Sequence, residues 1–455
     1  MKAINRKSFR YFYWIAVAFL KKNAQLILLS FLAGVIGIIT IVSISPYFIR
    51  VLTTKKHVIG MAGSYTVNNV PDEILGQISN SLVFINEKGE IIPILAESWE
   101  QLDDGKEYRF HLKKGLNWED GKDFTAHDLN YSFTDVQVEV PDDYVIVFKL
   151  KEPLPIFPTF LTEPVVRYPL QGVAGLYNVE RMKTQYGSLT ELHLTPNKEN
   201  YPIYIYKFYE NETKLINAFK MGEITEFSTT KKNIADLFRN WKNATIEEST
   251  DYSQLLTLFF NMNNPLLQER DVRKAISMSI PRDVIIEQGE QSFGPIPPTS
   301  WAYNTDIKQT QYNPDLSKKL FEKYMDGSSS AELKLSTFFD YLSTADTIRD
   351  SLKDIGINAN VNVFSPNELD SYDMLLAYWR VPQDPDQYYF WHSTQEQGNI
   401  SNYKNVKIDK LLEDGRSTID QSSRKEIYDS FQVVIADDLP AFFLYYPYVY
   451  NIVRK

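Results

Sequence analysis

The sequence predicts a mixed α/β protein, and three observations support this fold class. Short segments rich in alternating, β-branched or aromatic residues, typical of strands, interleave with segments of 3.6-residue apolar spacing, typical of helices. The chain has 455 residues, of which 44% are hydrophobic, so it can bury the cores of two or three domains. Tyr and Phe are abundant, and aromatic side chains fit the pleated surface of a sheet. An aromatic-lined cleft is the alternative explanation of this bias.

The N-terminal segment differs from the rest of the chain in charge. Residues 1–56 contain nine Lys or Arg and no acidic residue, whereas the remainder has 39 basic and 58 acidic residues. Residues 26–45 carry no charge, and a helix of this length spans about 30 Å, the thickness of the hydrocarbon core. We therefore expect a transmembrane helix or signal anchor at 26–47, with a basic cytoplasmic N-terminus at 1–25. A signal peptide cleaved near 43–45, or a buried core helix, is the alternative.

Two shorter segments flank the expected span. Residues 11–20 are apolar but too few to cross a membrane, so we expect them to lie along its cytoplasmic surface. Residues 48–56 are expected to form a linker to the rest of the chain.

From residue 57 onward, strands and helices follow each other without repeats or low-complexity tracts. Strands are expected at 57–62, 106–112, 144–150, 203–209, 255–261, 332–337, 359–364, 373–378 and 442–449. Helices are expected at 212–221, 271–279, 314–325, 344–355 and 422–437. Asn211 is predicted to cap the first helix and Gly222 to end it. Asp271 is predicted to cap the second, Pro314 to open the third, and Gly356 to end the fourth.

The run 91–133 is the most distinctive part of the sequence. A turn at 103–105 precedes an alternating strand in which Tyr108, Phe110 and Leu112 share one face. A Gly turn, a Trp anchor, a second Asp-Gly turn and a helix start follow.

This run resembles the bacterial solute-binding proteins that deliver peptides, and in some branches nickel, to ABC importers. Further segments resemble motifs of the same family in the right order: 194–225, 258–286, 312–327, 350–364, 401–415 and 437–446. The resemblance implies a two-lobed periplasmic-binding-protein-like fold (type II, cluster C), with the lobes joined by a pair of crossing strands. Lobe I would be 57–257 with the C-terminal strand 441–455, and lobe II would be 258–440.

The resemblance also implies a binding function without catalysis. The expected partners are a peptide or other small solute, an ABC permease and ATPase, and the membrane through residues 26–47, but no nucleic acid. The chain has no Cys, so it lacks the lipid-bearing Cys that tethers many relatives, and the uncleaved helix would replace it. The binding region is then extracytoplasmic. A tethered sensor or cell-surface binding protein of the same fold, without a role in transport, is the alternative.

Motifs of catalysis and of metal binding are missing. The sequence contains no H-E-x-x-H, G-x-S-x-G, Walker A or G-x-G-x-x-G motif. Its five His residues are scattered, and no two have the spacing of metal ligands. We expect no enzyme activity, no catalytic residues, no cofactor and no metal site.

The segment 375–393 is the best candidate for a ligand-binding wall. It resembles the family's loop that contains a Trp and an Asp-Pro pair, which Trp379 and Asp384 match, whereas the family's amine-binding Asp has no counterpart here. Arg380 could face an acidic ligand group or be a solvated charge, and Asp384 could cap a turn. The full set of predicted ligand-binding residues is Tyr65, Asn80, Asn261, Asn263, Trp301, Tyr303, Tyr378, Trp379, Arg380 and Asp384. For each of them a structural role, in an aromatic core or a local turn, is the alternative.

Overall fold

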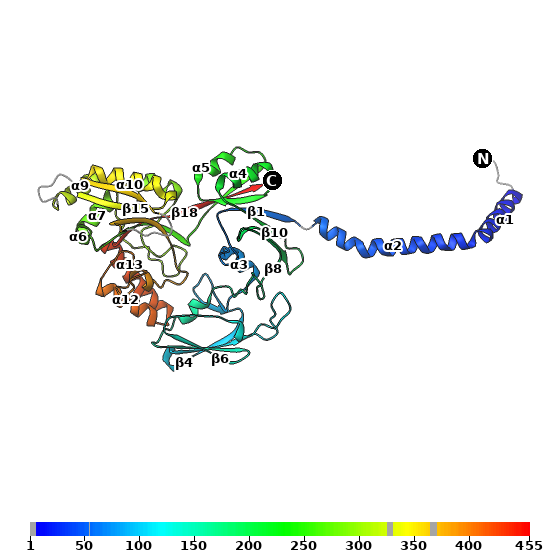
Figure 1. Cartoon of the computed structure of the whole chain (residues 1–455), viewed down its shortest axis with the longest axis horizontal. Coiled ribbons are helices and arrows are strands. Elements are labelled where there is room, and N and C mark those ends of the chain that lie inside the picture. The colour runs from blue at the N-terminus through cyan, green and yellow to red at the C-terminus, as the bar shows by residue number, and fades with distance from the viewer. Residues whose placement is uncertain (1–5, 54, 325–330, 365–370) are drawn as a thin grey trace. The chain divides into compact units, whose positions relative to one another are not determined.

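The computed structural model describes residues 6–53, 55–324, 331–364 and 371–455. The chain divides into two compact units, which we describe separately (Figure 1). The first unit runs over residues 1–56 and 198–203, and the second over residues 57–197 and 204–455.

Two helices make up most of the first unit. α1 (Arg6–Lys22) and α2 (Ala24–Thr53) are separated by Asn23. The backbone N and the side-chain Nδ2 of Asn23 both donate to the carbonyl of Phe19, at 3.0 and 3.1 Å. Asn side chains compete with the helical backbone for hydrogen bonds, which explains why the helix is interrupted at this residue.

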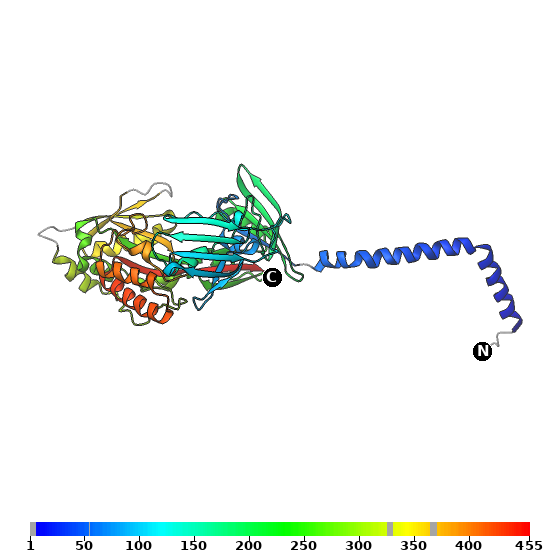
Figure 2. The same ribbon diagram turned by 90° about the horizontal axis from the view of Figure 1, so that it is seen from below.

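The interruption bends the first unit sharply. The axes of Phe9–Lys22 and Ala24–Thr40 differ by 71°. Figure 2 shows the bend between α1 and α2. In the described part of the chain, no single helix is both long enough and apolar enough to cross a membrane. The bent pair together has sufficient length and apolar composition. The transmembrane helix expected at 26–47 falls within α2 and stays a prediction.

A mixed sheet of twelve strands runs through the second unit. Its main path has the order β16-β15-β17-β13-β18-β11-β1-β10-β9-β8, and β12 and β14 both pair with β18. The strands are β1 (Lys56–Ala62), β8 (Tyr177–Gln185), β9 (Ser188–Pro196), β10 (Ile203–Tyr209), β11 (Glu226–Thr229), β12 (Ala244–Thr250), β13 (Gln254–Phe260), β14 (Gly289–Gln291), β15 (Ala331–Thr337), β16 (Ile357–Val363), β17 (Met374–Arg380) and β18 (Ala441–Arg454).

β18 connects the two halves of this sheet (Figure 1). Its first half pairs with β13 and β14, and its second half pairs with β12 and β11. β13 pairs with β17 from Gln254 to Phe260, so the predicted lobe boundary at 257/258 falls inside one continuous strand. The division into two lobes stays a prediction.

Both faces of the half-sheet around β13 are covered. Leu256, Leu258 and Phe260 pack into one apolar cluster, whereas Leu255 and Phe259 pack into another. The first cluster takes side chains from α7 (Arg270–Ser279), α9 (Pro314–Glu322) and α10 (Leu342–Asp354), and the second from α12 (Val406–Ser417) and α13 (Gln421–Asp438) (Figure 1). Burial on both faces explains why this strand is a continuous apolar run.

A separate antiparallel sheet has the order β4-β5-β7-β6 (Figure 2). It consists of β4 (Ala96–Leu102), β5 (Glu107–Leu112), β7 (Val145–Leu150) and β6 (Val136–Asp142), and a hairpin of β2 (Val83–Ile85) and β3 (Ile91–Pro93) precedes it. Tyr108, Phe110 and Leu112 are buried on one face, as predicted, and Trp118 packs into the same core.

The nine strands expected from the sequence are all found, with ends shifted by a few residues. The expected helices are also found, and α4 (Glu212–Met221) has the predicted bounds, with Asn211 as its cap and Gly222 in the left-handed conformation. The predicted cap Asp271 is wrong, because Glu269 occupies the N-cap of α7 and Asp271 lies in the first turn. Six α-helices described in the second unit were not predicted: the short α3 (Asp72–Ile78), α5 (Lys232–Phe238), α6 (Pro265–Gln268), α8 (Arg282–Ile285) and α11 (Tyr388–Trp391), and the longer α12.

Candidate functional site

Within the second unit, α3 and the β2–β3 hairpin meet residues that lie far later in the chain. Four pairs make this contact, and we call them the junction: Asp72 with Arg380, Ile85 with Gln383, Lys88 with Gln421, and Gly89 with Trp301. The first pair is an ion pair, and in the next two a Gln side chain donates to a backbone carbonyl, at 2.9 Å for Gln383. The junction thus combines a charge pair, polar contacts and an aromatic ring.

Gly89 fits the junction because it has no side chain. It lies in the turn of the β2–β3 hairpin with a φ of 78°, a conformation that favours Gly. A Cβ atom at this position would lie 2.3 Å from Nε1 of Trp301, closer than side chains tolerate. The hairpin can therefore rest against the indole ring only because residue 89 is Gly.

A buried ion pair lies next to the ring of Trp301. Asp384 accepts from Nη2 and Nη1 of Arg424 at 2.8 and 3.2 Å, and both side chains are about 90% buried. Burial alone would lower the pKa of the Arg424 guanidinium, but the Asp384 carboxylate raises this pKa above its usual value. The guanidinium carbon also lies 5.3 Å from the ring centroid of Trp301 and 5.4 Å from that of Tyr428.

Two of the predicted wall residues lie in the interior instead. Asp384 is the buried partner of Arg424, and its Oδ1 also accepts from the backbone N of Asp386 at 3.0 Å, so the turn-capping alternative describes it better. Trp379 is 6% exposed, donates from Nε1 to Oγ1 of Thr257 at 3.2 Å, and packs in the apolar cluster of α12 and α13. The structure therefore places both side chains in the interior, and their role in ligand binding stays a prediction.

The neighbouring strand residues are divided between surface and interior. Arg380 is 76% exposed and reaches Asp72 in the junction. Tyr378 is half-buried and packs edge-on against Tyr341 and Tyr445, with ring centroids 4.9 and 6.2 Å away, and burial raises the pKa of its hydroxyl.

The other predicted residues, Asn80, Asn261, Asn263 and Tyr303, are not part of the junction. Asn261 and Asn263 form one turn, in which Oδ1 of Asn261 accepts from the backbone N of Asn263 at 3.0 Å. Asn80 donates to the carbonyl of Ala174 at 2.7 Å. Tyr303 is half-buried two residues after Trp301. Asn261 also donates from Nδ2 to the carbonyl of Tyr372 at 2.8 Å, so both of its side-chain polar atoms are hydrogen-bonded within the fold, as is Nδ2 of Asn80.

Tyr65 points to a carboxylate that the sequence did not single out. Its hydroxyl donates to the carbonyl of Ala62 at 3.2 Å, and burial, followed by the charge of Glu73, raises the pKa of this hydroxyl. Glu73 lies in the first turn of α3, next to Asp72 of the junction. Glu73 is exposed, but desolvation by the surrounding protein still raises the pKa of its carboxyl, and among the described residues it has no ion-pair or hydrogen-bond partner.

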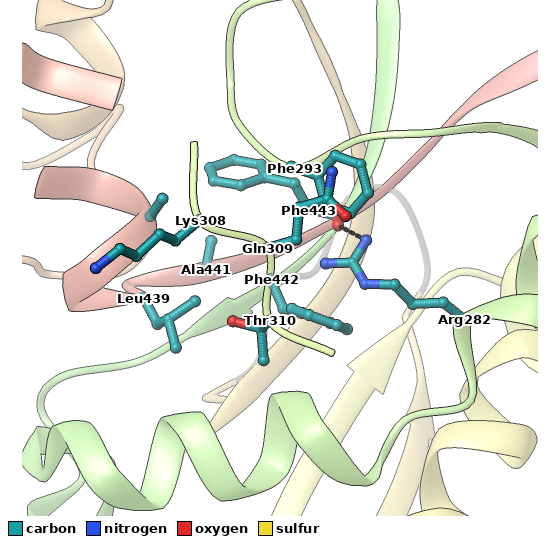
Figure 3. Close-up of a pocket in the computed structure, with 10 residues that line it drawn as sticks. Arg282, Phe293, Lys308, Gln309, Thr310, Leu439, Ala441, Phe442 and Phe443 are labelled. Carbon is teal, nitrogen blue, oxygen red and sulfur yellow. Dashed lines mark hydrogen bonds between the residues drawn. The ribbon is translucent and has the colours of Figure 1, made fainter. Parts of the chain in front are cut away.

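A small hollow beside Arg282 serves a structural role (Figure 3). Nη1 of Arg282 donates to the carbonyls of Ser292 and Phe443, each at 2.8 Å, and its guanidinium carbon lies 4.0 Å from the ring centroid of Phe442. Burial lowers the pKa of Arg282 to about 9. The hollow, of about 10 Å³, has room for one water molecule at most. Across the described ranges, no group of three or more His, Cys, Asp or Glu side chains is placed to hold a metal ion.

Comparisons with known proteins agree on one group. A profile of "Bacterial extracellular solute-binding proteins, family 5 Middle" matches residues 90–137 and 196–401. The oligopeptide-binding protein AppA of Bacillus subtilis is 25% identical over 458 residues, which cover 84% of this chain and 83% of AppA. The probable D,D-dipeptide-binding periplasmic protein DdpA of Escherichia coli is 27% identical over 412 residues, which cover 77% of this chain and 78% of DdpA.

Solved structures show the same fold. The structure of Bacillus subtilis AppA in complex with a nonapeptide has a TM-score of 0.71 at 22% identity and covers 89% of this chain and 95% of that chain. The structure of NikZ from Campylobacter jejuni in complex with Ni(L-His) has a TM-score of 0.72 at 20% identity and covers 88% of this chain and 94% of that chain. The mixed α/β fold therefore matches that of cluster C periplasmic binding proteins.

Proposed function

This chain belongs to the bacterial extracellular solute-binding proteins of family 5, and on that premise we propose that it is a membrane-anchored receptor that captures a peptide or similar small solute between two lobes. It then delivers the solute to the permease and ATPase of an ABC importer. Members of this family bind solutes and are not enzymes. The observation that carries the proposal is the family match, because it runs through both predicted lobes.

The junction supports closure of two lobes around a solute. Its residues 72, 85, 88 and 89 fall in predicted lobe I, and their partners 301, 380, 383 and 421 fall in predicted lobe II. Hinged closure of two lobes around a ligand is an established domain motion. Direct contacts between the lobes would stabilise the closed arrangement and add to the contacts that the ligand makes.

Glu73 is the group that we assign to the amino end of a peptide. The amine-binding Asp of the family has no counterpart in the 375–393 segment, and Asp384 is paired with Arg424. Glu73 lies beside the junction and has no ion-pair or hydrogen-bond partner among the described residues, and after burial its charge contributes to the raised pKa of the Tyr65 and Tyr206 hydroxyls. A ligand ammonium would supply the missing counter-charge.

We expect Glu73→Gln to weaken the binding of peptides that have a free α-amine by about tenfold to a hundredfold, the value of one charge-assisted hydrogen bond. N-acetylated peptides should bind the variant and the parent equally. The pKa of Glu73 is raised by desolvation, and affinity for free-amine peptides should fall as pH is lowered through this pKa, because the carboxyl then loses its charge. Calorimetry with matched acetylated peptides measures both effects, and Glu97→Gln, at an exposed position, is the control. An equal loss for both peptide classes would exclude an amine contact.

The proposal as a whole has a direct test. The full chain, purified in detergent, should bind members of a mixed peptide library, which mass spectrometry of the washed complex would identify, and the recovered peptides should raise its unfolding temperature. At a peptide concentration one hundred times the dissociation constant, the expected stabilisation is about 2.7 kcal/mol. Absence of any bound peptide and of any stabilisation would refute peptide binding.

A receptor without a role in transport is the second candidate. The burial of Asp384 favours this candidate. The resemblance assigns the loop of Asp384 to ligand contact, but here Asp384 forms a buried ion pair with Arg424. Uptake of a recovered peptide by cells with and without this chain separates the two candidates.

A further inference from the structure

The helix α1 carries three Phe and two basic side chains on opposite sides, and Trp14, four residues after Arg10, lies on the basic side. Phe9, Phe12 and Phe19 stand at i, i+3 and i+10 and therefore lie on one side of the helix. Arg10 and Lys21 are eleven residues apart, which is three helical turns, so they share a side as well. At about 100° per residue, the centres of these two sets lie on opposite sides of the axis.

The aromatic face has no cover within the protein. Phe9, Phe12 and Phe19 are 72%, 69% and 63% exposed. In the part of the chain that the structure describes, none of the five apolar clusters contains a residue of α1. An exposed aromatic stripe of this length requires an apolar partner.

The bend at Asn23 indicates how this partner is oriented. The helix segment that follows, Ala24–Thr40, is apolar and differs in direction from Phe9–Lys22 by 71°. If this segment crosses a bilayer along its normal, α1 is inclined by only about 20° to the membrane plane. Trp14, Tyr11 and Tyr13 then lie at the depth of the headgroups, where amphipathic aromatic rings concentrate.

The positive charge of α1 favours contact with anionic lipids. The helix contains no acidic residue, and it ends with Lys21 and Lys22 in its last turn. Basic residues beside a membrane span are attracted to the anionic lipids of the cytoplasmic leaflet. A helix with one basic and one aromatic face is the typical form of a segment that lies in the membrane surface.

We propose that α1 lies in the headgroup region of the cytoplasmic leaflet, with its aromatic face toward the acyl chains and Arg10 and Lys21 toward anionic headgroups. This inference rests on the membrane anchoring in the proposed function. The anchor then consists of two elements, a span and a surface helix held at a fixed angle by Asn23. The surface helix resists withdrawal of the N-terminus through the bilayer.

The absence of Cys makes the depth of single positions measurable in the full chain. Spin labels are placed on the variants Phe12→Cys and Phe19→Cys on the aromatic face, and on Val17→Cys and Lys21→Cys on the opposite face. The labelled chains are reconstituted in vesicles of phosphatidylcholine and phosphatidylglycerol. We expect labels at 12 and 19 to collide more with oxygen than with a water-soluble nickel chelate, and labels at 17 and 21 to show the reverse. Equal accessibility at all four positions would overturn the proposal.

A label at Val35→Cys separates this inference from the anchoring itself. Oxygen-dominated accessibility at 35 combined with chelate-dominated accessibility at 12, 17, 19 and 21 retains the span and refutes the surface helix. Chelate-dominated accessibility at 35 refutes the anchoring.

The lipid requirement is tested by removing charge from either side. In vesicles of phosphatidylcholine alone, or with Arg10→Gln, Lys21→Gln and Lys22→Gln combined, the difference in accessibility between labels at 12 and 19 and the label at 17 should fall by at least half. The same substitution at Lys56, beyond the helices, is the matched control and should change nothing. An unchanged difference without phosphatidylglycerol would overturn the assignment to anionic lipid.

Discussion

Replacement of Asp384 by Asn should lower the free energy of unfolding by about 3–5 kcal/mol. The substitution removes the counter-charge of Arg424, which is only 9% exposed, so its charge stays buried without a counter-charge. Of the two hydrogen bonds of the pair, at 2.8 and 3.2 Å, one is lost because the amide NH2 cannot accept, and the other keeps only a neutral acceptor. The midpoint of urea unfolding of the full chain, followed by far-ultraviolet circular dichroism, measures the loss.

Two controls separate the effect of burial from that of losing an ion pair. Asp414→Asn removes the exposed pair with Lys410 and should cost about 0.5 kcal/mol or less. The double variant Asp384→Leu with Arg424→Met removes both buried charges and should recover much of the loss. A cost below about 1 kcal/mol for Asp384→Asn would show that water reaches Arg424, contrary to its burial.

The local parts of the fold were predictable because their signals lie within a few residues. The strand with Tyr108, Phe110 and Leu112 alternates because one face packs on a core and the other meets water. The bounds of α4 follow from Asn211, which accepts from the backbone N of Lys214, and from Gly222, which takes the left-handed conformation.

The site was harder to predict, because long-range packing decides which side chains are free. Trp379 lies on a strand whose two faces are both covered by helices, so no alternation distinguishes a buried aromatic ring from one that faces a ligand. Asp384 is paired with a residue forty positions later, and no local pattern indicates that partner. Glu73 and Gly89 lie in short elements, a seven-residue helix and a tight turn, whose positions only the tertiary structure reveals.

Replacement of Gly89 by Ala should lower ligand affinity at least about tenfold while the second unit stays folded. A Cβ at residue 89 would lie 2.3 Å from Nε1 of Trp301 and 2.4 Å from its Cδ1, so the hairpin cannot rest on the indole ring. The variant therefore destabilises the arrangement in which the junction is formed, and a ligand that binds this arrangement must supply the difference.

Gly115→Ala is the matched control for this clash. Gly115 has a φ of 77°, nearly the same as the 78° of Gly89, but a Cβ there meets no atom within 4 Å. Both variants therefore carry the same backbone strain of about 1 kcal/mol, and only Gly89→Ala carries the clash.

Calorimetry with a peptide recovered from the library measures the affinity. Distances between spin labels at Ser98→Cys and Lys407→Cys, both exposed, report whether the two lobes approach each other. Since the clash is with Trp301, the added change Trp301→Ala should restore the short distance in Gly89→Ala. Equal affinities for the two Gly variants would show that the junction takes no part in ligand binding.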